Sequence, residues 1–192
     1  MGDLPSGSVT FMFSDIVDST RLVKAARDLY PRLLAEHQLM IRAAIASHSG
    51  FELDTQGDAF LVAFASAKQA TMCALDIQRA FVAHDWPRGL PVAVRIGIHT
   101  GQAAPADGRY TGPAVHRAAR VCAAADGGQV LLAQATPTIL EDEEEGQGFR
   151  LLDTGQHRLK GFDRPALPIG EARPRFQLRN TESKHVFQGF AS

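Results

Sequence analysis

Two aspartates in the sequence stand where carboxylates can bind a divalent cation. Asp15 follows an apolar run, Val9 to Phe13, that has the composition of a buried strand. Asp58 stands in the segment Thr55-Gln56-Gly57-Asp58-Ala59-Phe60, where the glycine marks a turn between two strand-like runs. Carboxylates and phosphate oxygens are the ligands that Mg²⁺ prefers. The two aspartates therefore predict a site for a pair of magnesium-like ions and the phosphates that they bind.

An arginine further along the chain, Arg120, is suited to bind phosphate. Pro113 predicts the start of a helix around this residue, and Gly127-Gly128 predicts its end. His116 and Arg120 are four residues apart and therefore project from one face of that helix. A guanidinium fixed on a helix face makes bidentate contacts with phosphate oxygens.

The pattern of apolar residues predicts the elements that must position these side chains. Strands are expected near residues 9–13, 51–55, 59–64 and 92–100, with one helix from Pro31 to Gly50 and another from the capping box at Ser66 to Pro87. This β-α-β-β-α-β order is typical of a ferredoxin-like α+β sandwich. A polar hairpin at Asp107-Gly108, the helix after Pro113 and later short elements are appended: a strand at 130–132, a helix at 134–140, and strands at 149–153, 157–160 and 175–178.

We expect a single domain over residues 9–178, with a lead-in at 1–8 and a tail at 179–192. The 192 residues, 45% hydrophobic and 21% charged, suit a globular protein with a real core. The net charge of −1 argues against nucleic acid and anionic membranes as partners. No apolar run is long enough to span a membrane, and the sequence opens without a signal peptide. Cys73 and Cys122 are interpreted as buried thiols, so we expect the cytoplasm.

Several motifs in order resemble those of class III nucleotidyl (adenylyl/guanylyl) cyclase catalytic domains of the bacterial type. The resemblance covers roughly Ser8 to Leu178. The segments that carry it are Phe13-Ser14-Asp15-Ile16-Val17-Asp18-Ser19-Thr20, Thr55-Gln56-Gly57-Asp58-Ala59-Phe60, Arg95-Ile96-Gly97-Ile98-His99-Thr100-Gly101, Gly112-Pro113-Ala114-Val115-His116-Arg117-Ala118-Ala119-Arg120, Gly128-Gln129-Val130-Leu131-Leu132 and Arg158-Leu159-Lys160-Gly161.

The resemblance implies a two-metal enzyme that acts on ATP or GTP. Asp15 and Asp58 would hold two Mg²⁺ or Mn²⁺ ions, with the Ile16 carbonyl as a further ligand. One ion would lower the pKa of the ribose 3′-hydroxyl, and the other would hold the triphosphate and the leaving pyrophosphate. The backbone of Val17, Asp18, Ser19 and Thr20 would cradle phosphates, although Asp18 fits a turn or cap better than a third metal ligand.

The same resemblance divides the site between two subunits. Arg120 would meet the charge that develops on the α-phosphate, and Lys160 is a further candidate for a phosphate contact. In this family, the metal-binding carboxylates and the helix that carries the arginine come from different subunits. A homodimer with composite sites is therefore implied, with a heterodimer as the alternative.

Three positions depart from the family's pattern. Adenylyl cyclases of this class select adenine with a lysine where this chain has Asp54, and with an aspartate where it has Arg109. The asparagine that positions the ribose is replaced by His116. At Asp54 a hydrogen-bond acceptor thus replaces a donor, and at Arg109 a donor replaces an acceptor. This arrangement matches the N1–H and O6 edge of guanine better than the edge of adenine.

The departures leave three readings of the function open. The chain could prefer guanine or accept either purine, retain weak adenylyl activity, or be a catalytically degenerate module that binds nucleotide or a partner in signalling. Asp54 and Arg109 could also pair with each other across the interface, and His116 could be an ordinary polar residue on a helix face. A nucleic-acid-binding ferredoxin-like domain is disfavoured by the neutral charge and the absence of RNA-stacking aromatic motifs.

Overall fold

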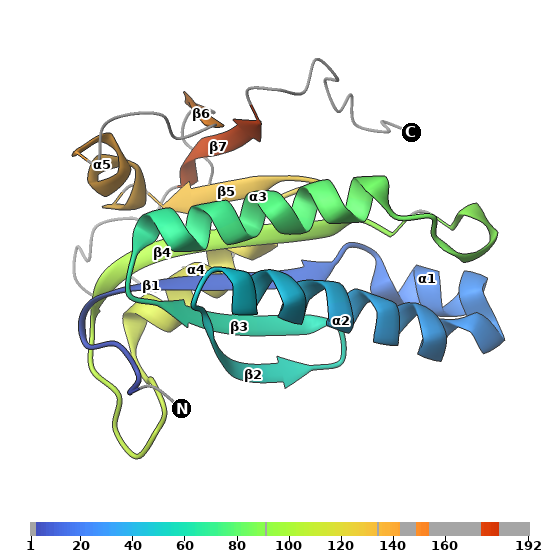
Figure 1. Ribbon diagram of the computed structural model, residues 1–192, viewed down its shortest axis with the longest axis horizontal. Coiled ribbons are helices and arrows are strands. Elements are labelled where there is room, and N and C mark those ends of the chain that lie inside the picture. Colours follow the sequence, from blue (N-terminus) through green and yellow to red (C-terminus); the bar gives the residue numbers. More distant parts are fainter. Residues whose placement is uncertain (1–2, 91, 134, 143–148, 154–173, 181–192) are drawn as a thin grey trace, which may run out of the picture.

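The computed structural model of the chain describes residues 3–90, 92–133, 135–142, 149–153 and 174–180. Within these residues seven strands form one sheet in the order β2-β3-β1-β4-β5-β7-β6 (Figure 1). The strands are β1 (Gly7–Ile16), β2 (Phe51–Gln56), β3 (Ala59–Phe64), β4 (Val94–Ala103), β5 (Val130–Ala133), β6 (Phe149–Asp153) and β7 (Pro174–Asn180). The helices are α1 (Ser19–Ala26), α2 (Tyr30–Ser47), α3 (Ala67–Ala83), α4 (Pro113–Ala123) and α5 (Ala135–Asp142).

The first four strands confirm the predicted ferredoxin-like sandwich. β1 lies between β3 and β4 and pairs antiparallel with both, and β2 completes this part of the sheet as the edge strand. The appended part follows: β5 pairs parallel with β4, and β7 and β6 continue the sheet antiparallel. The predicted strand at 157–160, with Lys160, lies outside the described residues, as do residues 181–192 of the expected tail.

One face of the sheet is covered by α2 and α3 (Figure 1). Leu33, His37, Ile41 and Ile45 recur every four residues along α2, and all four are buried. Pro31 stands at the start of this helix, as predicted. The predicted cap of α3 is confirmed as well, since the Ser66 hydroxyl accepts a hydrogen bond from the Gln69 N–H at 3.4 Å.

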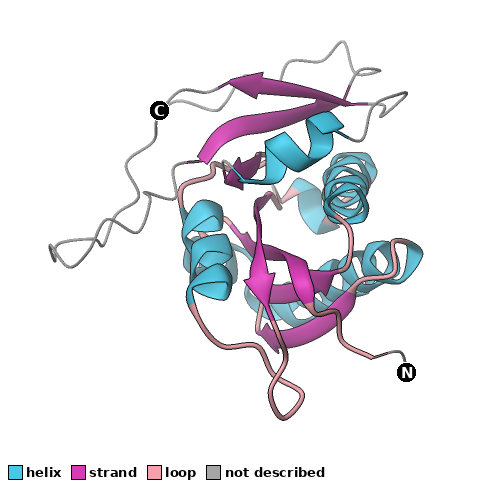
Figure 2. Cartoon of the chain, turned by 90° about the vertical axis from the view of Figure 1, so that its left-hand side faces the viewer, coloured by secondary structure: helices cyan, strands magenta, loops and turns pink. Residues whose placement is uncertain are grey.

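The opposite face of the sheet carries α4, which Figures 1 and 2 place behind β1 and β4 when α2 and α3 are in front. Gly97 of β4 makes this close packing possible. A Cβ atom at Gly97 would lie 2.1 Å from the Cys122 nitrogen and 2.7 Å from the Ala118 oxygen. The backbone of α4 therefore rests directly on the backbone of β4.

The predicted end of α4 was wrong by several residues. The helix ends at Ala123, and a turn leads from there through Gly127-Gly128 into β5. The Ala123 carbonyl accepts a hydrogen bond from Arg95 at 3.3 Å, and the Gly128 N–H donates to Val94 at 2.9 Å. These contacts draw the chain back toward β4 between the end of the helix and the start of β5.

Two further expectations can be compared with the structure. Cys73 and Cys122 are both free and buried, and burial raises the pKa of each thiol to about 12. Among the described helices, none combines the length and the hydropathy that a membrane span requires.

His37 is a fully buried histidine of the core, packed against the rings of Phe60 and Phe81. Neither of its ring nitrogens has a hydrogen-bond partner among the described residues. Burial, with a smaller contribution from the nearby Arg42, lowers the pKa of His37 to about 4. The folded chain therefore keeps this imidazole neutral at pH values where the unfolded chain protonates it.

This burial predicts a loss of stability in acid. Above pH 6.5 both states hold a neutral His37; as the pH falls from 6.5 to about 4, the unfolded state binds a proton that the folded state excludes. The lowered pKa accounts for about 3 kcal/mol lost over this interval. The free energy of unfolding of His37→Leu, measured with urea at several pH values, should fall by about 3 kcal/mol less over this interval than that of the parent. In the exposed control His116→Gln, the free energy of unfolding should depend on pH as it does in the parent. The same pH dependence in all three proteins would contradict the prediction.

Candidate active site

The two predicted metal-binding carboxylates, Asp15 and Asp58, line the same cavity at the end of β1. The cavity measures about 510 Å³. Its lining combines acidic, basic and hydroxyl side chains from β1, α1, the β2–β3 turn and β4. The lining residues are Asp15, Ile16, Asp18, Ser19, Thr20, Arg21, Lys24, Asp58, Ala59 and Arg95.

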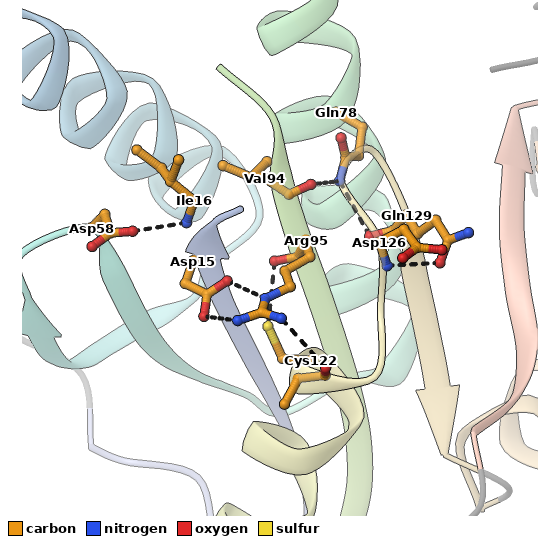
Figure 3. A network of polar contacts seen from close by, with 10 residues as sticks. Asp15, Ile16, Asp58, Gln78, Val94, Arg95, Cys122, Asp126 and Gln129 are labelled. Carbon is orange, nitrogen blue, oxygen red and sulfur yellow. Dashed lines mark hydrogen bonds and ion pairs between the residues drawn. The ribbon is translucent and has the colours of Figure 1, made fainter. Parts of the chain in front are cut away.

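Asp15 is held by a bidentate ion pair with Arg95. The two residues are cross-strand partners in β1 and β4. Arg95 Nε lies 2.5 Å from Asp15 Oδ1, and Arg95 Nη2 lies 2.9 Å from Oδ2 (Figure 3). These bonds raise the pKa of Arg95, and both side chains remain about a quarter exposed, at 29% and 25%. The carboxylate is thus oriented and neutralised while still facing the cavity.

Asp58 is held by the backbone of β1. Its Oδ2 accepts a hydrogen bond from the Ile16 N–H at 3.0 Å (Figure 3), which connects the β2–β3 turn to the strand that carries Asp15. Tyr30, at the start of α2, lies close enough to be affected by this charge. Burial raises the pKa of Tyr30, and the negative charge of Asp58 raises it further.

The other residues predicted to cradle phosphates lie in the turn between β1 and α1 and in the first turn of α1. Asp18 caps α1 with a left-handed backbone conformation, φ 53°, and its carbonyl accepts from the Arg21 and Leu22 N–H groups. Ser19 and Thr20, in the first turn of α1, line the cavity, so the positive end of this helix faces it. Val17 is not part of the lining, and its N–H donates to the Ala93 carbonyl at 2.9 Å.

The donor atoms suit Mg²⁺ or Mn²⁺. Mg²⁺ is commonly bound by one or two carboxylates together with waters and substrate phosphates. Asp15 and Asp58 supply that number, and no third His, Cys, Asp or Glu of the described chain completes a three-residue cluster with them. Asp18 therefore lines the cavity without joining the pair. An ion at Asp15 has to compete with the Arg95 guanidinium, whereas only one oxygen of Asp58 is engaged by the Ile16 N–H.

The remaining predicted site residues of the described chain lie outside this cavity. Arg120 is half-buried on α4, and His116 is exposed on the same helix. Asp54 is exposed on β2 and accepts a hydrogen bond from Gln56 Nε2 at 2.9 Å. Arg109 is exposed beside the predicted Asp107-Gly108 turn, whose residues both have positive φ. The residues that line the cavity lie between positions 15 and 24 and at positions 58, 59 and 95.

Three cationic residues of the cavity were not predicted from the sequence. Arg95 belongs to a motif that was recognised without a role for this residue, and its partner becomes visible only through the register of β1 and β4. Arg21 and Lys24 extend from α1, and no motif in the sequence singles them out. A signal was available for Lys24, since it lies one helical turn after Thr20 and so shares its face.

Comparison with known proteins identifies the relatives of the chain. A family model described as Adenylate and Guanylate cyclase catalytic domain matches residues 3–173. An uncharacterized protein of Mycobacterium tuberculosis is 35% identical over 163 residues, which are 84% of this chain and 54% of that protein. An adenylate cyclase of Podospora anserina is 29% identical over 84% of this chain and 10% of its own length. The chain thus spans about half of the mycobacterial relative and a tenth of the fungal one.

The fold has a solved counterpart. A structure of adenylate cyclases from Trypanosoma brucei in their monomeric state aligns with a TM-score of 0.79 at 26% sequence identity. The alignment covers 96% of this chain and 93% of that one. The similarity therefore extends over the whole sheet and its helices.

The Asp15–Arg95 pair predicts a strong energetic coupling. In a double-mutant cycle with Asp15→Ala and Arg95→Met, we expect a coupling of about 1–3 kcal/mol in the free energy of unfolding, because the pair is bidentate and largely buried. Urea denaturation of the four proteins measures it. The exposed Arg32–Glu36 pair of α2 is the control, with an expected coupling of about 0.3–0.5 kcal/mol. A coupling no larger than the control's would show that Arg95 does not hold Asp15.

Proposed function

Because this chain belongs to the Adenylate and Guanylate cyclase catalytic domain family, we propose that it converts ATP or GTP to the 3′,5′-cyclic monophosphate and pyrophosphate. The observation that carries the proposal is the cavity at the end of β1. It joins two carboxylates, Asp15 and Asp58, with three cationic side chains and the start of a helix. This combination matches a triphosphate that carries divalent ions.

The reaction is an intramolecular phosphoryl transfer. The ribose 3′-oxygen forms a bond to the α-phosphorus and loses its proton, and the bond from that phosphorus to the bridging oxygen of the β-phosphate breaks. Pyrophosphate leaves with the electron pair. Mg²⁺ or Mn²⁺ ions, when bound, supply Lewis acidity at the 3′-oxygen and at the phosphates.

The residues of the chain bind and orient the triphosphate. Asp15, Asp58 and the Ile16 carbonyl provide the oxygen ligands for the ions. Ser19 and Thr20 offer N–H groups at the start of α1, and Arg21, Lys24 and Arg95 add positive charge around the phosphates. For Val17, Asp18 and Lys160, the phosphate contacts implied by the family resemblance stay predictions.

Arg120 completes the site from a second subunit. In its own chain Arg120 stands on α4, outside the lining of the cavity. A partner related by a two-fold axis would bring its own arginine to the phosphates, where it stabilises the charge that develops in the transition state. We therefore propose a homodimer with two composite sites, with a heterodimer formed with a longer partner as the alternative.

Guanine is the base that the altered pocket suits better. Asp54 offers an acceptor for the guanine N1–H, and Arg109 offers a donor for O6; both side chains are exposed in the single chain and available to a partner's site. His116, on the exposed face of α4, replaces the amide that positions the ribose. The alternative is a degenerate, nucleotide-binding module, which the same three substitutions support.

The cytoplasm is the proposed place of action. Nucleoside triphosphates are made there, and two free, buried thiols are typical of a reducing compartment.

The main proposal predicts cyclic product from the purified chain. Incubation with Mn²⁺ and either ATP or GTP should yield a 3′,5′-cyclic nucleotide and one equivalent of pyrophosphate, measured by chromatography. Asp58→Asn and Arg120→Ala should each lower the rate at least a hundredfold, since each removes a charge that acts on the phosphates. Absence of product with both nucleotides at high protein concentration would refute the catalytic proposal.

Mixing these two variants tests the shared site. Half of the dimers formed by random exchange are mixed, and one of the two sites in each mixed dimer carries both intact residues, so about a quarter of the parent's activity should return. A mixture as inactive as its components would exclude the composite site.

The altered pocket predicts a preference for GTP. Double substitution of Asp54→Lys with Arg109→Asp should change the ratio of kcat/KM for GTP over ATP by about tenfold or more toward ATP, because each hydrogen bond to a charged group contributes about 1.5–3 kcal/mol. Steady-state rates with both nucleotides measure the ratio. A parent that already prefers ATP would contradict the guanine proposal. If only the variant that also carries His116→Asn is active, the parent is the degenerate module.

A further inference from the structure

The turn that carries Asp58 is attached to the middle of α2. Gln38 Nε2 donates a hydrogen bond to the Gly57 carbonyl at 2.8 Å. This carbonyl belongs to the peptide group that joins Gly57 to Asp58. A side chain nineteen residues earlier in the sequence thus fixes the peptide that leads into a proposed metal ligand.

That peptide group is the most easily rotated part of the turn. Gln56 and Ala59 pair across the hairpin, so Gly57 and Asp58 form a two-residue loop. Gly57 has a φ of 62°, whereas Asp58 does not have a positive φ, as in a type II′ turn. Rotation of the central peptide converts such a turn into type I′, in which the second residue takes a positive φ. Asp58 would then point in another direction.

The amide of Gln38 is itself oriented by neighbouring charges. Arg42 Nη1 donates to Gln38 Oε1 at 3.3 Å, which leaves the Nε2 end directed at the turn. Arg42 in turn forms two bonds of 2.9 Å to Glu52 on β2. The β2–β3 hairpin is therefore hydrogen-bonded to α2 through two side chains, Gln38 and Arg42. Of the two, Gln38 contacts the residue next to Asp58 in the sequence.

We propose that Gln38 is a positioning residue for Asp58: it holds the central peptide of the β2–β3 turn so that Asp58 faces Ile16 and the cavity. The inference rests on the proposed function insofar as Asp58 serves as a metal ligand. Gln38 acts through the backbone of the turn and is not among the residues that line the cavity.

The substitution Gln38→Glu isolates this bond. Glutamate has the same shape and still accepts from Arg42, but its carboxylate cannot donate to the Gly57 carbonyl. We expect the dissociation constant for Mn²⁺, measured by electron paramagnetic resonance on the full chain, to rise about fivefold, as for the loss of one neutral hydrogen bond. The added negative charge by itself would tighten cation binding, so weaker binding distinguishes positioning from simple electrostatics.

Amide hydrogen exchange supplies a readout that is independent of metal and activity. The Ile16 N–H is bonded to Asp58, so its exchange in the metal-free Gln38→Glu protein should be about fivefold faster if Asp58 reorients. Gln38→Leu, which removes the donor without adding charge, should give the same acceleration. The charge-matched control Gln102→Glu, on the exposed end of β4, should change neither quantity.

The outcomes separate this inference from the cyclase proposal. Unchanged Ile16 exchange together with unchanged or tighter Mn²⁺ binding in Gln38→Glu would overturn the role of Gln38, whether or not the parent makes cyclic product. Equal effects in Gln102→Glu would overturn it as well. Faster Ile16 exchange in both Gln38 variants supports the positioning role even in a chain that has no cyclase activity.

Discussion

The ion pair between Arg95 and Asp15 is the interaction on which the geometry of the cavity depends. It joins β4 to the end of β1 and holds a carboxylate that is three-quarters buried, which would be costly to leave without a partner. The same guanidinium reaches the Ala123 carbonyl at the end of α4. Two strands and a helix therefore meet at a single side chain, next to the acidic and basic residues that line the cavity.

The charge of the cavity follows from this arrangement. One carboxylate is already neutralised by a guanidinium, while the other, Asp58, is held by a backbone N–H group and keeps its charge exposed to an incoming cation. A cation bound at both carboxylates must share Asp15 with Arg95 or displace it. Once displaced, the guanidinium remains among the other basic residues of the lining, close to where phosphates are proposed to bind.

The sequence was most informative where local chemistry decides the structure. The strand that delivers Asp15, the glycine turn at Asp58, the Ser66 cap and the Pro31 helix start are all local features, and the structure has each of them, although β1 runs on through Asp15 to Ile16. Arg95 and Gln38 were missed for the opposite reason: their roles come from strand register and from the packing of α2 on the hairpin, over separations of 80 and 19 residues. The end of α4 was misjudged because contacts with β4 outweigh the helix-ending preference of the two glycines.

The contact of α4 with β4 at Gly97 has a mechanical consequence. No side chain separates the two backbones at Gly97, and the Cys122 thiol donates to the Arg95 carbonyl at 3.4 Å. The helix and the strand are therefore in direct backbone contact, without a layer of side chains that could repack between them. The helix that carries Arg120 is thus placed on β4 by direct contact between the two backbones. A shift of α4 along or away from β4 would therefore have to separate two backbones that are already in contact.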